Sequence, residues 1–445
     1  MSDFDFFIDF FNNLPLFLSL MAAMTLMLYL SIKRVAPAGY LDPIHFYWTF
    51  TFGSAYGVIL GLFFLGEIDL ELVSMITLFG LIFILSFRFF ASRPKIRFRS
   101  FFERLLIPQG EGKIEFTVVL IVYLLILVLV VAFVGVGMFA ETNRFEQNRG
   151  FGPLVRVADA LRLFVVAYVS LMVVKRYRRK NRFTLDTVAL SILLILLIVI
   201  GSVVNGAKFA LLEAIYAVVV ASAIFTSKPR FRLWLALSVF ASALAFAMLV
   251  LSANLNNDAS TKGAEATYME GNSLVVERLV LRILANADKY YFSLPNHVID
   301  KLKTDNVVVA FVTPFVGIGK MSSLVGYDVS EYSIGRQTLM YFYPDNDVAG
   351  GPTSHFDLFA YKYFGWFGGP LFVLAISFLL SSIMFLTKCG QGKVFYSSLA
   401  AALWLRSQAV ILEPTVGFSY VFDIFLLFFI LKIVCACFRG RPASP

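Results

Sequence analysis

The feature that most constrains this chain is a succession of apolar runs separated by short charged loops. Each run has about 18–25 residues, enough to cross the hydrocarbon core of a bilayer as a helix whose backbone hydrogen bonds are all internal. The runs lie near 14–32, 44–66, 71–91, 115–139, 154–174, 184–204, 207–226, 231–251, 357–386, 394–412 and 416–437. They predict an all-α polytopic membrane protein with about eleven transmembrane helices.

The composition agrees with this class. The chain is 59% hydrophobic and only 15% charged, whereas soluble domains carry about a quarter charged residues. The N-terminus is acidic where a signal peptide needs a basic region, so we expect no cleavage. Cys389, Cys435 and Cys437 all lie near the C-terminal end, which excludes a disulfide framework and a cysteine-based metal cluster. We expect residues 1–445 to form one integral membrane domain.

The loops between the runs alternate in charge. Lysine and arginine gather in one set of loops, at 33–34, 93–113, 175–182, 228–232, 388–393 and 439–441. Acidic residues mark the other set, at the N-terminus, 66–71, 141–150 and 413. Because lysine and arginine in short loops stay on the cytoplasmic side, we expect the N-terminus outside and the C-terminus in the cytoplasm. The long polar interval 252–356 is then also outside.

Part of this interval, 273–294, has the pattern of an amphipathic helix. Its polar face carries Arg278, Arg282, Asn286 and Lys289. This stripe could be the solvated face of a helix at the membrane interface. It could also bind a phosphate or pyrophosphate, for which the planar fork of arginine is suited.

The interval ends in a turn-rich segment, which we expect to place His355 and Asp357 at the outer end of the ninth apolar run. Both residues have the acid–base chemistry of a general base, and Asp357 could equally cap the start of a helix. The run Asp345-Asn346-Asp347 is similar to an Asp-x-Asp metal motif. Ordinary turn chemistry after Pro344 is the favoured interpretation.

Lys208 follows the tight turn Asn205–Gly206 between two apolar runs, at the predicted outer face. One interpretation is a hairpin whose lysine reaches the interface. The other is a fixed cation at the start of a helix, able to hold an anionic headgroup.

Arg406 lies in an apolar run about seven residues, or roughly 10 Å of helix, from Glu413. An ionisable side chain at that depth faces a cavity or a partner, for which Glu213 is a candidate. In the fifth run, Arg162 can pair with Asp159 three residues earlier.

Taken in order along the chain, several short motifs resemble those of the Wzy-type O-antigen polymerases, which join oligosaccharide repeat units. The motifs are Asp42–Pro43, Arg149-Gly150-Phe151-Gly152, Asn205-Gly206-Ala207-Lys208, Tyr343-Pro344-Asp345, Gly351–Pro352, Asp357 and Phe364–Gly365. The resemblance covers most of the chain. One departure is that members of the family often have glutamate at the position of Asp357.

The resemblance implies a metal-independent glycosyltransferase of the GT-C type in the bacterial inner membrane, without a cofactor. Its donor and acceptor are undecaprenyl-pyrophosphate-linked oligosaccharides at the periplasmic face. A flippase and a chain-length regulator are candidate protein partners, and no nucleic acid is expected to bind. Asp357 or His355 would take a proton from the acceptor hydroxyl. Fixed cations would stabilise the pyrophosphate leaving group. The candidates are Lys208, Arg278, Arg282, Arg406, Arg149, Arg336 and Lys289.

Two other functions compete with this one. An O-antigen ligase shares the lipid-linked donor but uses the lipid A core as acceptor, and His355 keeps that alternative open. A flippase or other carrier is less favoured, because the sequence has no evident internal repeat and its buried charges cluster in the predicted outer half.

Overall fold

The computed structural model describes residues 6–108, 112–137, 150–182, 184–206, 209–227, 268, 274–345 and 351–438. These residues are helical and contain no strand, and nine of their helices are long and apolar enough to span a membrane. The nine are α2 (Leu14–Ile32), η2 (His45–Phe50) with α3 (Thr51–Phe64), α4 (Leu70–Ser92), α6 (Lys113–Phe133), α8 (Gly152–Lys180), α9 (Leu185–Asn205), α18 (Phe356–Thr387), α19 (Val394–Ser407) with α20 (Ala409–Leu412), and α21 (Pro414–Phe438).

The predicted class, an all-α polytopic membrane protein, is confirmed. A shorter apolar helix, α10 (Ala210–Thr226), coincides with the seventh predicted run. The eighth predicted run, 231–251, lies outside the described residues, so the predicted total of about eleven stays a prediction.

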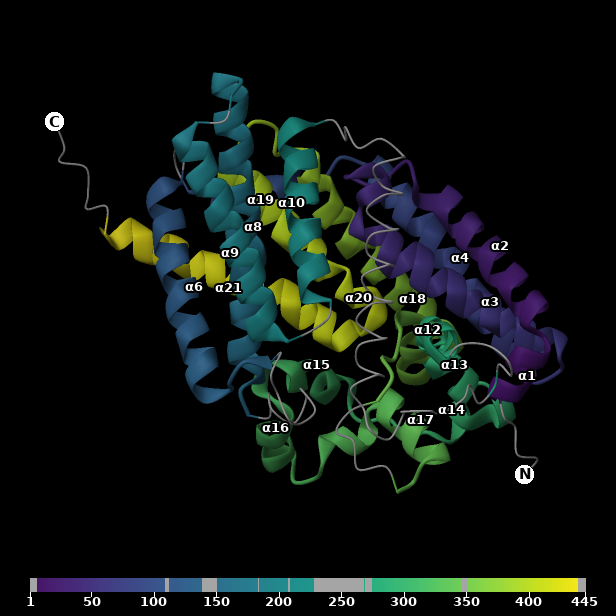
Figure 1. Cartoon of the computed structure of the whole chain (residues 1–445). Helices are drawn as coiled ribbons and strands as arrows, with labels where there is room; N and C mark the ends of the chain where they lie inside the picture. The colour runs from purple at the N-terminus through teal and green to yellow at the C-terminus, as the bar shows by residue number, and fades with distance from the viewer. Residues whose placement is uncertain are drawn as a thin grey trace.

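Two groups of helices form the bundle (Figure 1). α2, α3 and α4 pack together on one side, and α6, α8 and α9 on the other. α18 packs along α4, while α19 packs on α8 and α10 and also contacts α18, so these two helices join the groups.

The α2–α3 interface is made by glycines spaced four residues apart. Gly53, Gly57 and Gly61 all point at α2, and a Cβ on Gly57 would lie 2.4 Å from the Cα of Met21. Small residues at this spacing let two membrane helices approach backbone to backbone. The glycines therefore set the position of α3, which carries Tyr56 of the candidate site and Phe52, whose ring stacks on His355.

α18 consists of two helical segments, joined at Gly365, that lie side by side. Gly365 breaks the helix with φ 64° and ψ −166°, a conformation that glycine alone adopts readily. Residues nine apart in a continuous helix would be separated by about 13.5 Å. A Cβ on Gly369 would instead lie 3.3 Å from the carbonyl oxygen of Ala360, and the rings of Phe359 and Phe372 are 5.4 Å apart. Residues 356–364 thus form a short re-entrant helix that turns back at Gly365.

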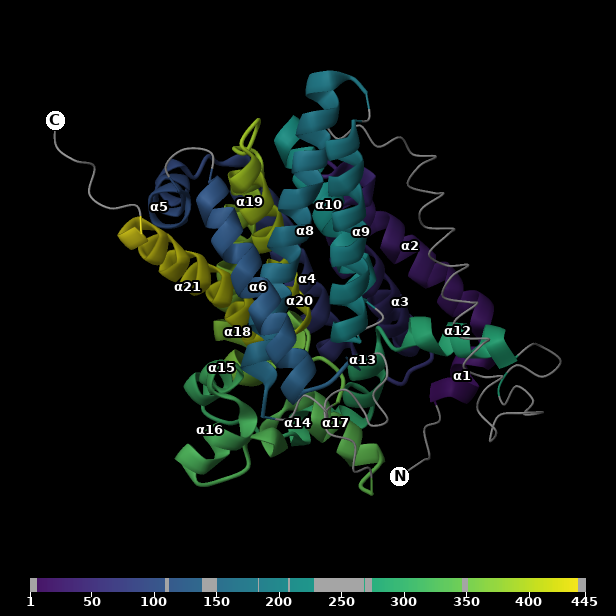
Figure 2. The ribbon, with the colours of Figure 1, turned by 60° about the vertical axis from the view of Figure 1, so that its left-hand side comes forward.

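The polar interval supplies a cap at one end of the bundle, the lower end in Figures 1 and 2. Its helices are α12 (Leu274–Leu284), α13 (Asp288–Ser293), α14 (Val298–Lys301), α15 (Val307–Val316), α16 (Ile318–Val325) and α17 (Ile334–Phe342). α15 is apolar and packs on α21, where the rings of Phe311 and Phe418 are 5.4 Å apart. The short α1 (Phe6–Asn12) contributes Phe6, whose ring stacks on that of Tyr291 at 4.0 Å.

Acidic and basic loops lie at opposite ends of the bundle, as their alternation along the sequence predicts. At the capped end, Asp69 before α4 meets His297 of the polar interval. At the other end, Arg34 after α2, Arg88 near the end of α4 and Lys388 after α18 line one cavity. The loop at Lys393 is joined to α5 (Ile96–Leu106) through Glu103, at 3.8 Å.

We predict that Gly57→Leu destabilises the protein by at least about 1–3 kcal/mol, because the added side chain must displace the backbone of α2. The measurement is the free energy of unfolding of the full chain in detergent. Gly319→Leu is the matched control, since a Cβ there meets nothing within 4 Å. Equal losses in the two variants would contradict the proposed helix contact.

Candidate functional site

A cluster of polar side chains lies buried where the cap meets the bundle. His355 and Asp357 come from the start of the re-entrant helix and are both 0% exposed. α13 contributes Lys289 and Tyr290, and α3 contributes Tyr56. Three segments far apart in the sequence therefore meet at one point.

Hydrogen bonds connect these five side chains. The hydroxyl of Tyr290 lies 2.8 Å from both carboxylate oxygens of Asp357 and 2.9 Å from Nδ1 of His355. Tyr56 donates to Asp357 at 2.9 Å. Nζ of Lys289 lies 3.3 Å from Nε2 of His355.

The partners assign the protons of His355. A lysine ammonium can only donate, so Nε2 accepts from Lys289 and the imidazole hydrogen is on Nδ1. Nδ1–H then donates to the oxygen of Tyr290, and the Tyr290 hydroxyl donates to Asp357. The result is a continuous chain of hydrogen bonds from Lys289 to Asp357.

Burial and neighbouring charge keep this chain in one protonation state. Burial, followed by the Lys289 ammonium, lowers the pKa of His355 well below its ordinary value, so the imidazole is neutral near pH 7. Burial, followed by the charge of Asp357, raises the pKa of Tyr290 well above 10, so its hydroxyl keeps its proton.

The backbone around His355 is held in an uncommon conformation. Its φ is 44°, in the left-handed region that residues other than glycine rarely adopt. The His355 amide donates to the carbonyl of Leu412 at 2.8 Å. Next to it, Ser354 donates from its amide and its hydroxyl to Glu413, at 2.7 and 2.9 Å. Residues in such conformations cost about 1–3 kcal/mol and cluster at functional sites.

His355 and Asp357 lie at the N-terminal end of α18, a candidate membrane span, as predicted; that this end is the outer one stays a prediction. The ring of His355 stacks on Phe52 at 4.4 Å, and Asp357 bonds to Tyr56, near the middle of the span His45–Phe64. Residues 356–364 fold back on the rest of α18 at Gly365, and both side chains are buried inside the bundle. A hydropathy pattern registers only one long apolar run there.

The predicted arginine stripe does not form one face of one helix. The helix breaks between Leu284 and Asp288, so Lys289 turns inward and is 4% exposed, while Arg278 and Arg282 remain exposed on α12. Glu277, on the same helix, is 1% exposed. The structure therefore brings Lys289 to His355 and leaves the two arginines on the surface of the cap.

The other predicted cations are dispersed or outside the described residues. Arg336 lies half-buried on α17, where Asp328 is its electrostatic neighbour. Lys208 and Arg149 lie outside the described residues, as do Asn346 and Asp347 of the Asp-x-Asp run.

A second polar cluster lies inside the bundle between α8, α10, α19 and α21. Arg162 donates to Glu213 at 2.7 Å and lies 3.4 Å from Asp159, as predicted for the pair on α8. Asn205 donates to both oxygens of Asp159, at 2.7 and 2.9 Å. The prediction that Glu213 pairs with Arg406 is wrong as a direct contact, since Arg162 takes that carboxylate.

Arg406 is the least satisfied member of this second cluster. It is 5% exposed, and its guanidinium lies over the ring of Tyr420 at 3.6 Å. Nε and Nη2 of Arg406 have no hydrogen-bond partner among the described residues. Asp159, Glu213 and Asp423 are its electrostatic neighbours, but none of them forms a direct ion pair with it.

The two clusters are adjacent along one segment of chain. Arg406 lies near the end of α19, and Leu412 at the end of α20 accepts the backbone hydrogen bond of His355. One short stretch of chain therefore links the two clusters, whereas Arg278 and Arg282 lie exposed on the cap.

Comparison with known proteins gives no match: no family model, no curated protein and no solved structure is similar to this chain. Among the described residues no group of three or more His, Cys, Asp or Glu side chains could hold a metal ion.

Sequence reasoning missed Tyr56 and Tyr290. Both are tyrosines in apolar surroundings, which is the ordinary composition of a membrane helix or its interface. Arg162, Glu213 and Arg406 were detectable from the sequence because a charge inside an apolar run requires a partner.

We predict that the contact of His297 with Asp69 and Asp300, which we call the latch between cap and bundle, depends on pH. Its two ring nitrogens lie 2.9 Å from Asp69 and 2.9 Å from Asp300. The hydrogen bond to Asp300 is the largest cause of a pKa raised above the usual 6.5, and the charges of Asp69 and Asp300 add to it. A raised folded-state pKa means that the latch stabilises the cap fully below that usual value. The stabilisation is lost as the pH rises through the raised pKa.

The latch is measured by amide hydrogen exchange of residues 295–303 over a pH series, corrected for intrinsic exchange rates. Protection should fall as His297 deprotonates, and His297→Gln should remove this dependence. If wild type and variant show the same pH profile, the latch does not operate.

We predict that substitution of the two buried arginines has unequal effects on stability. Arg162→Met should cost about 3–5 kcal/mol, because it leaves Glu213 and Asp159 without their cation. Arg406→Met should change stability by about 1 kcal/mol or less, since the lost contact with Tyr420 is offset by removal of an underpaired buried charge. Unfolding in mixed micelles gives both values. A large loss for Arg406→Met would mean that the residue is a structural element.

Proposed function

We propose that this protein is a metal-independent membrane glycosyltransferase that polymerises undecaprenyl-pyrophosphate-linked oligosaccharide repeat units, as an O-antigen or related polysaccharide polymerase. The observation that carries the proposal is a neutral buried histidine beside a lysine ammonium, close to a buried arginine with unpartnered donors. Transfer from a pyrophosphate requires a base for the acceptor hydroxyl and fixed cations for the leaving group.

The proposed reaction exchanges one bond to the anomeric carbon for another. The acceptor hydroxyl oxygen forms a bond to the anomeric carbon of the growing glycan. The bond from that carbon to the pyrophosphate oxygen breaks, and the lipid pyrophosphate leaves with the electron pair. The acceptor proton passes to Nε2 of His355.

His355 is the proposed catalytic base, because its Nε2 is the one free basic nitrogen of the cluster once Lys289 moves away. An arriving pyrophosphate offers Lys289 an anionic partner and so releases Nε2. The sequence left His355 and Asp357 as equal candidates. The carboxylate of Asp357 already accepts from Tyr56, from Tyr290 and from the amide of Leu358, so we assign it a positioning role through Tyr290.

Arg406 and Lys289 are the proposed pyrophosphate-binding residues. The uncompensated donors of Arg406 and the ammonium of Lys289 supply positive charge where the leaving group develops negative charge. Lys208 and Arg149 remain proposed contributors on the strength of the resemblance. Arg278, Arg282 and Arg336 are proposed only as outer contacts, since they lie on the cap.

The proposed setting is the bacterial inner membrane, with the capped end in the periplasm, the N-terminus periplasmic and the C-terminus cytoplasmic. The support is the charge sorting of the loops: basic residues gather at the end opposite the cap. A flippase that delivers the lipid-linked repeat and a chain-length regulator are the proposed partners.

The second candidate function is an O-antigen ligase, which uses the same donor with the lipid A core as acceptor. The central position of His355 in the buried cluster favours it equally on chemical grounds, because either acceptor presents a sugar hydroxyl. The resemblance of the ordered motifs to the polymerases places polymerisation first.

Complementation distinguishes the functions. Expression in a polymerase-null strain should restore a ladder of long glycans on a gel, and expression in a ligase-null strain should not restore glycan attachment. Attachment in the ligase-null strain alone would establish the ligase instead. A single-repeat product with active export in both strains would contradict both the polymerase and the ligase proposals.

We predict that His355→Ala and Lys289→Met abolish the ladder, with turnover reduced by about 10²–10⁴-fold. Arg406→Met should also abolish it while the protein remains stable. Asp357→Asn should retain partial activity, because the amide keeps the shape but loses an acceptor for Tyr290. Lys320→Gln, which removes an exposed cation of α16, is the matched control and should keep the ladder. Membrane abundance is measured for each variant, and a full ladder from His355→Ala would exclude the assigned base.

A further inference from the structure

The end of the bundle opposite the cap holds a cavity of about 490 Å³ between α2, α4 and the loop after α18. Its lining includes four cationic residues, Lys33, Arg34, Arg88 and Lys388, and no carboxylate. No residue of the His355 cluster lines the cavity, so the proposed reaction makes no use of it.

The cations of the cavity are crowded and poorly neutralised. Nζ of Lys388 donates only to a backbone carbonyl, that of Ala91, at 3.3 Å. Lys33 lies over the ring of Tyr29 at 5.8 Å. Burial and then the charge of Lys388 lower the pKa of the neighbouring Lys95. Like charges held together without carboxylates favour binding of an anion.

Directly beneath these cations, α2 and α4 present exposed apolar side chains. Leu30, which also lines the cavity, is 51% exposed, and Leu26 one turn further along α2 is 57% exposed. On α4, Leu85 and Leu81 lie one and two turns from Arg88 and are 65% and 47% exposed. Residues three and four apart share a helix face, so each helix carries cations at the mouth and an apolar stripe below.

We propose that this cavity binds an anionic glycerophospholipid of the surrounding bilayer, with the phosphate on Arg34, Arg88 and Lys388. The acyl chains lie along the apolar stripes of α2 and α4. Basic pockets between transmembrane helices recognise lipid headgroups through such charge complementarity. A free phosphate would use the same cations but none of the leucines, which is why the bilayer lipid is the occupant we assign.

The test is native mass spectrometry of the full chain in mild detergent. The probes are phosphatidylglycerol and phosphatidylethanolamine with identical acyl chains, each added alone and together, and inorganic phosphate as competitor. Wild type should prefer phosphatidylglycerol by about tenfold or more. Arg34→Gln/Arg88→Gln/Lys388→Gln should lose that preference, and millimolar phosphate should not displace the lipid.

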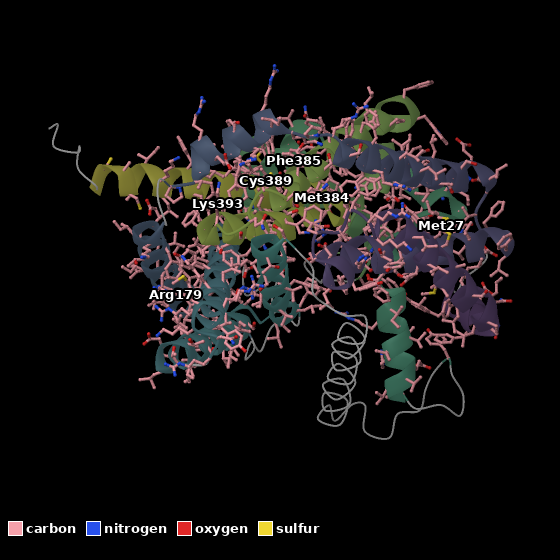
Figure 3. The ribbon with its side chains drawn as sticks, turned by 90° about the horizontal axis from the view of Figure 1, so that it is seen from above. Met27, Arg179, Met384, Phe385, Cys389 and Lys393 are labelled. Carbon is pink, nitrogen blue, oxygen red and sulfur yellow. The ribbon has the colours of Figure 1, made fainter. Side chains whose placement is uncertain are left out.

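The control removes the same charge elsewhere on the basic side of the molecule. Arg178→Gln/Arg179→Gln/Lys180→Gln changes exposed residues at the end of α8; Figure 3 shows Arg179 far across the molecule from Met27 of α2. This variant should keep the preference for phosphatidylglycerol. Equal loss in both triple variants, or displacement by phosphate, would overturn the proposal.

A measurement without substitutions covers the case in which the cavity variant fails to fold. Wild-type protein is cross-linked with a photoreactive phosphatidylglycerol, and the modified peptides are mapped. Labelling concentrated in 26–34 and 81–92 supports the site. Labelling spread evenly over the lipid-facing helices contradicts it.

Discussion

The central constraint on this structure is that polar groups deep in an apolar bundle must find protein partners, because water is not there to supply them. The carboxylate of Asp357 meets this constraint through Tyr56 and Tyr290. Tyr56 belongs to the bundle and Tyr290 to the cap. The carboxylate of Asp357 therefore joins the polar interval to the membrane helices through hydrogen bonds and fixes the position of the cluster in the bundle.

The two buried arginines, Arg162 and Arg406, meet the same constraint to different degrees. Arg162 has its donors on Glu213, Asp159 and the carbonyl of Ala210, so its charge is matched within the protein. Arg406 keeps two donors unmatched at similar burial. A buried charge without a direct ion pair has a cost, which the anionic ligand proposed above would offset.

The two ends of the molecule differ in their charged residues. At the capped end, carboxylates and histidines join the cap to the bundle, as in the pair Asp69–His297. At the opposite end, cations surround an open cavity above exposed leucines. Ion pairs thus join the cap to the bundle at one end, and positive charge gathers at the other.

Much of the fold was predictable from the sequence. Apolar runs of spanning length dictate helices, because no other element lets a single segment satisfy its backbone in lipid. The charge of the loops predicted which loops share an end, and buried charges such as Arg162 pointed to partners on neighbouring helices. These are local properties, readable from residue type and spacing alone.

Only the tertiary structure decided the site. The hydropathy of 357–386 is the same whether the segment spans once or turns back at Gly365, since both alternatives are apolar. Lys289 shares a helical period with Arg278, yet a break after Leu284 turns it inward. The meeting of Tyr56, Tyr290 and His355 depends on contacts between segments far apart in the chain, and single-sequence periodicity carries no information about such contacts.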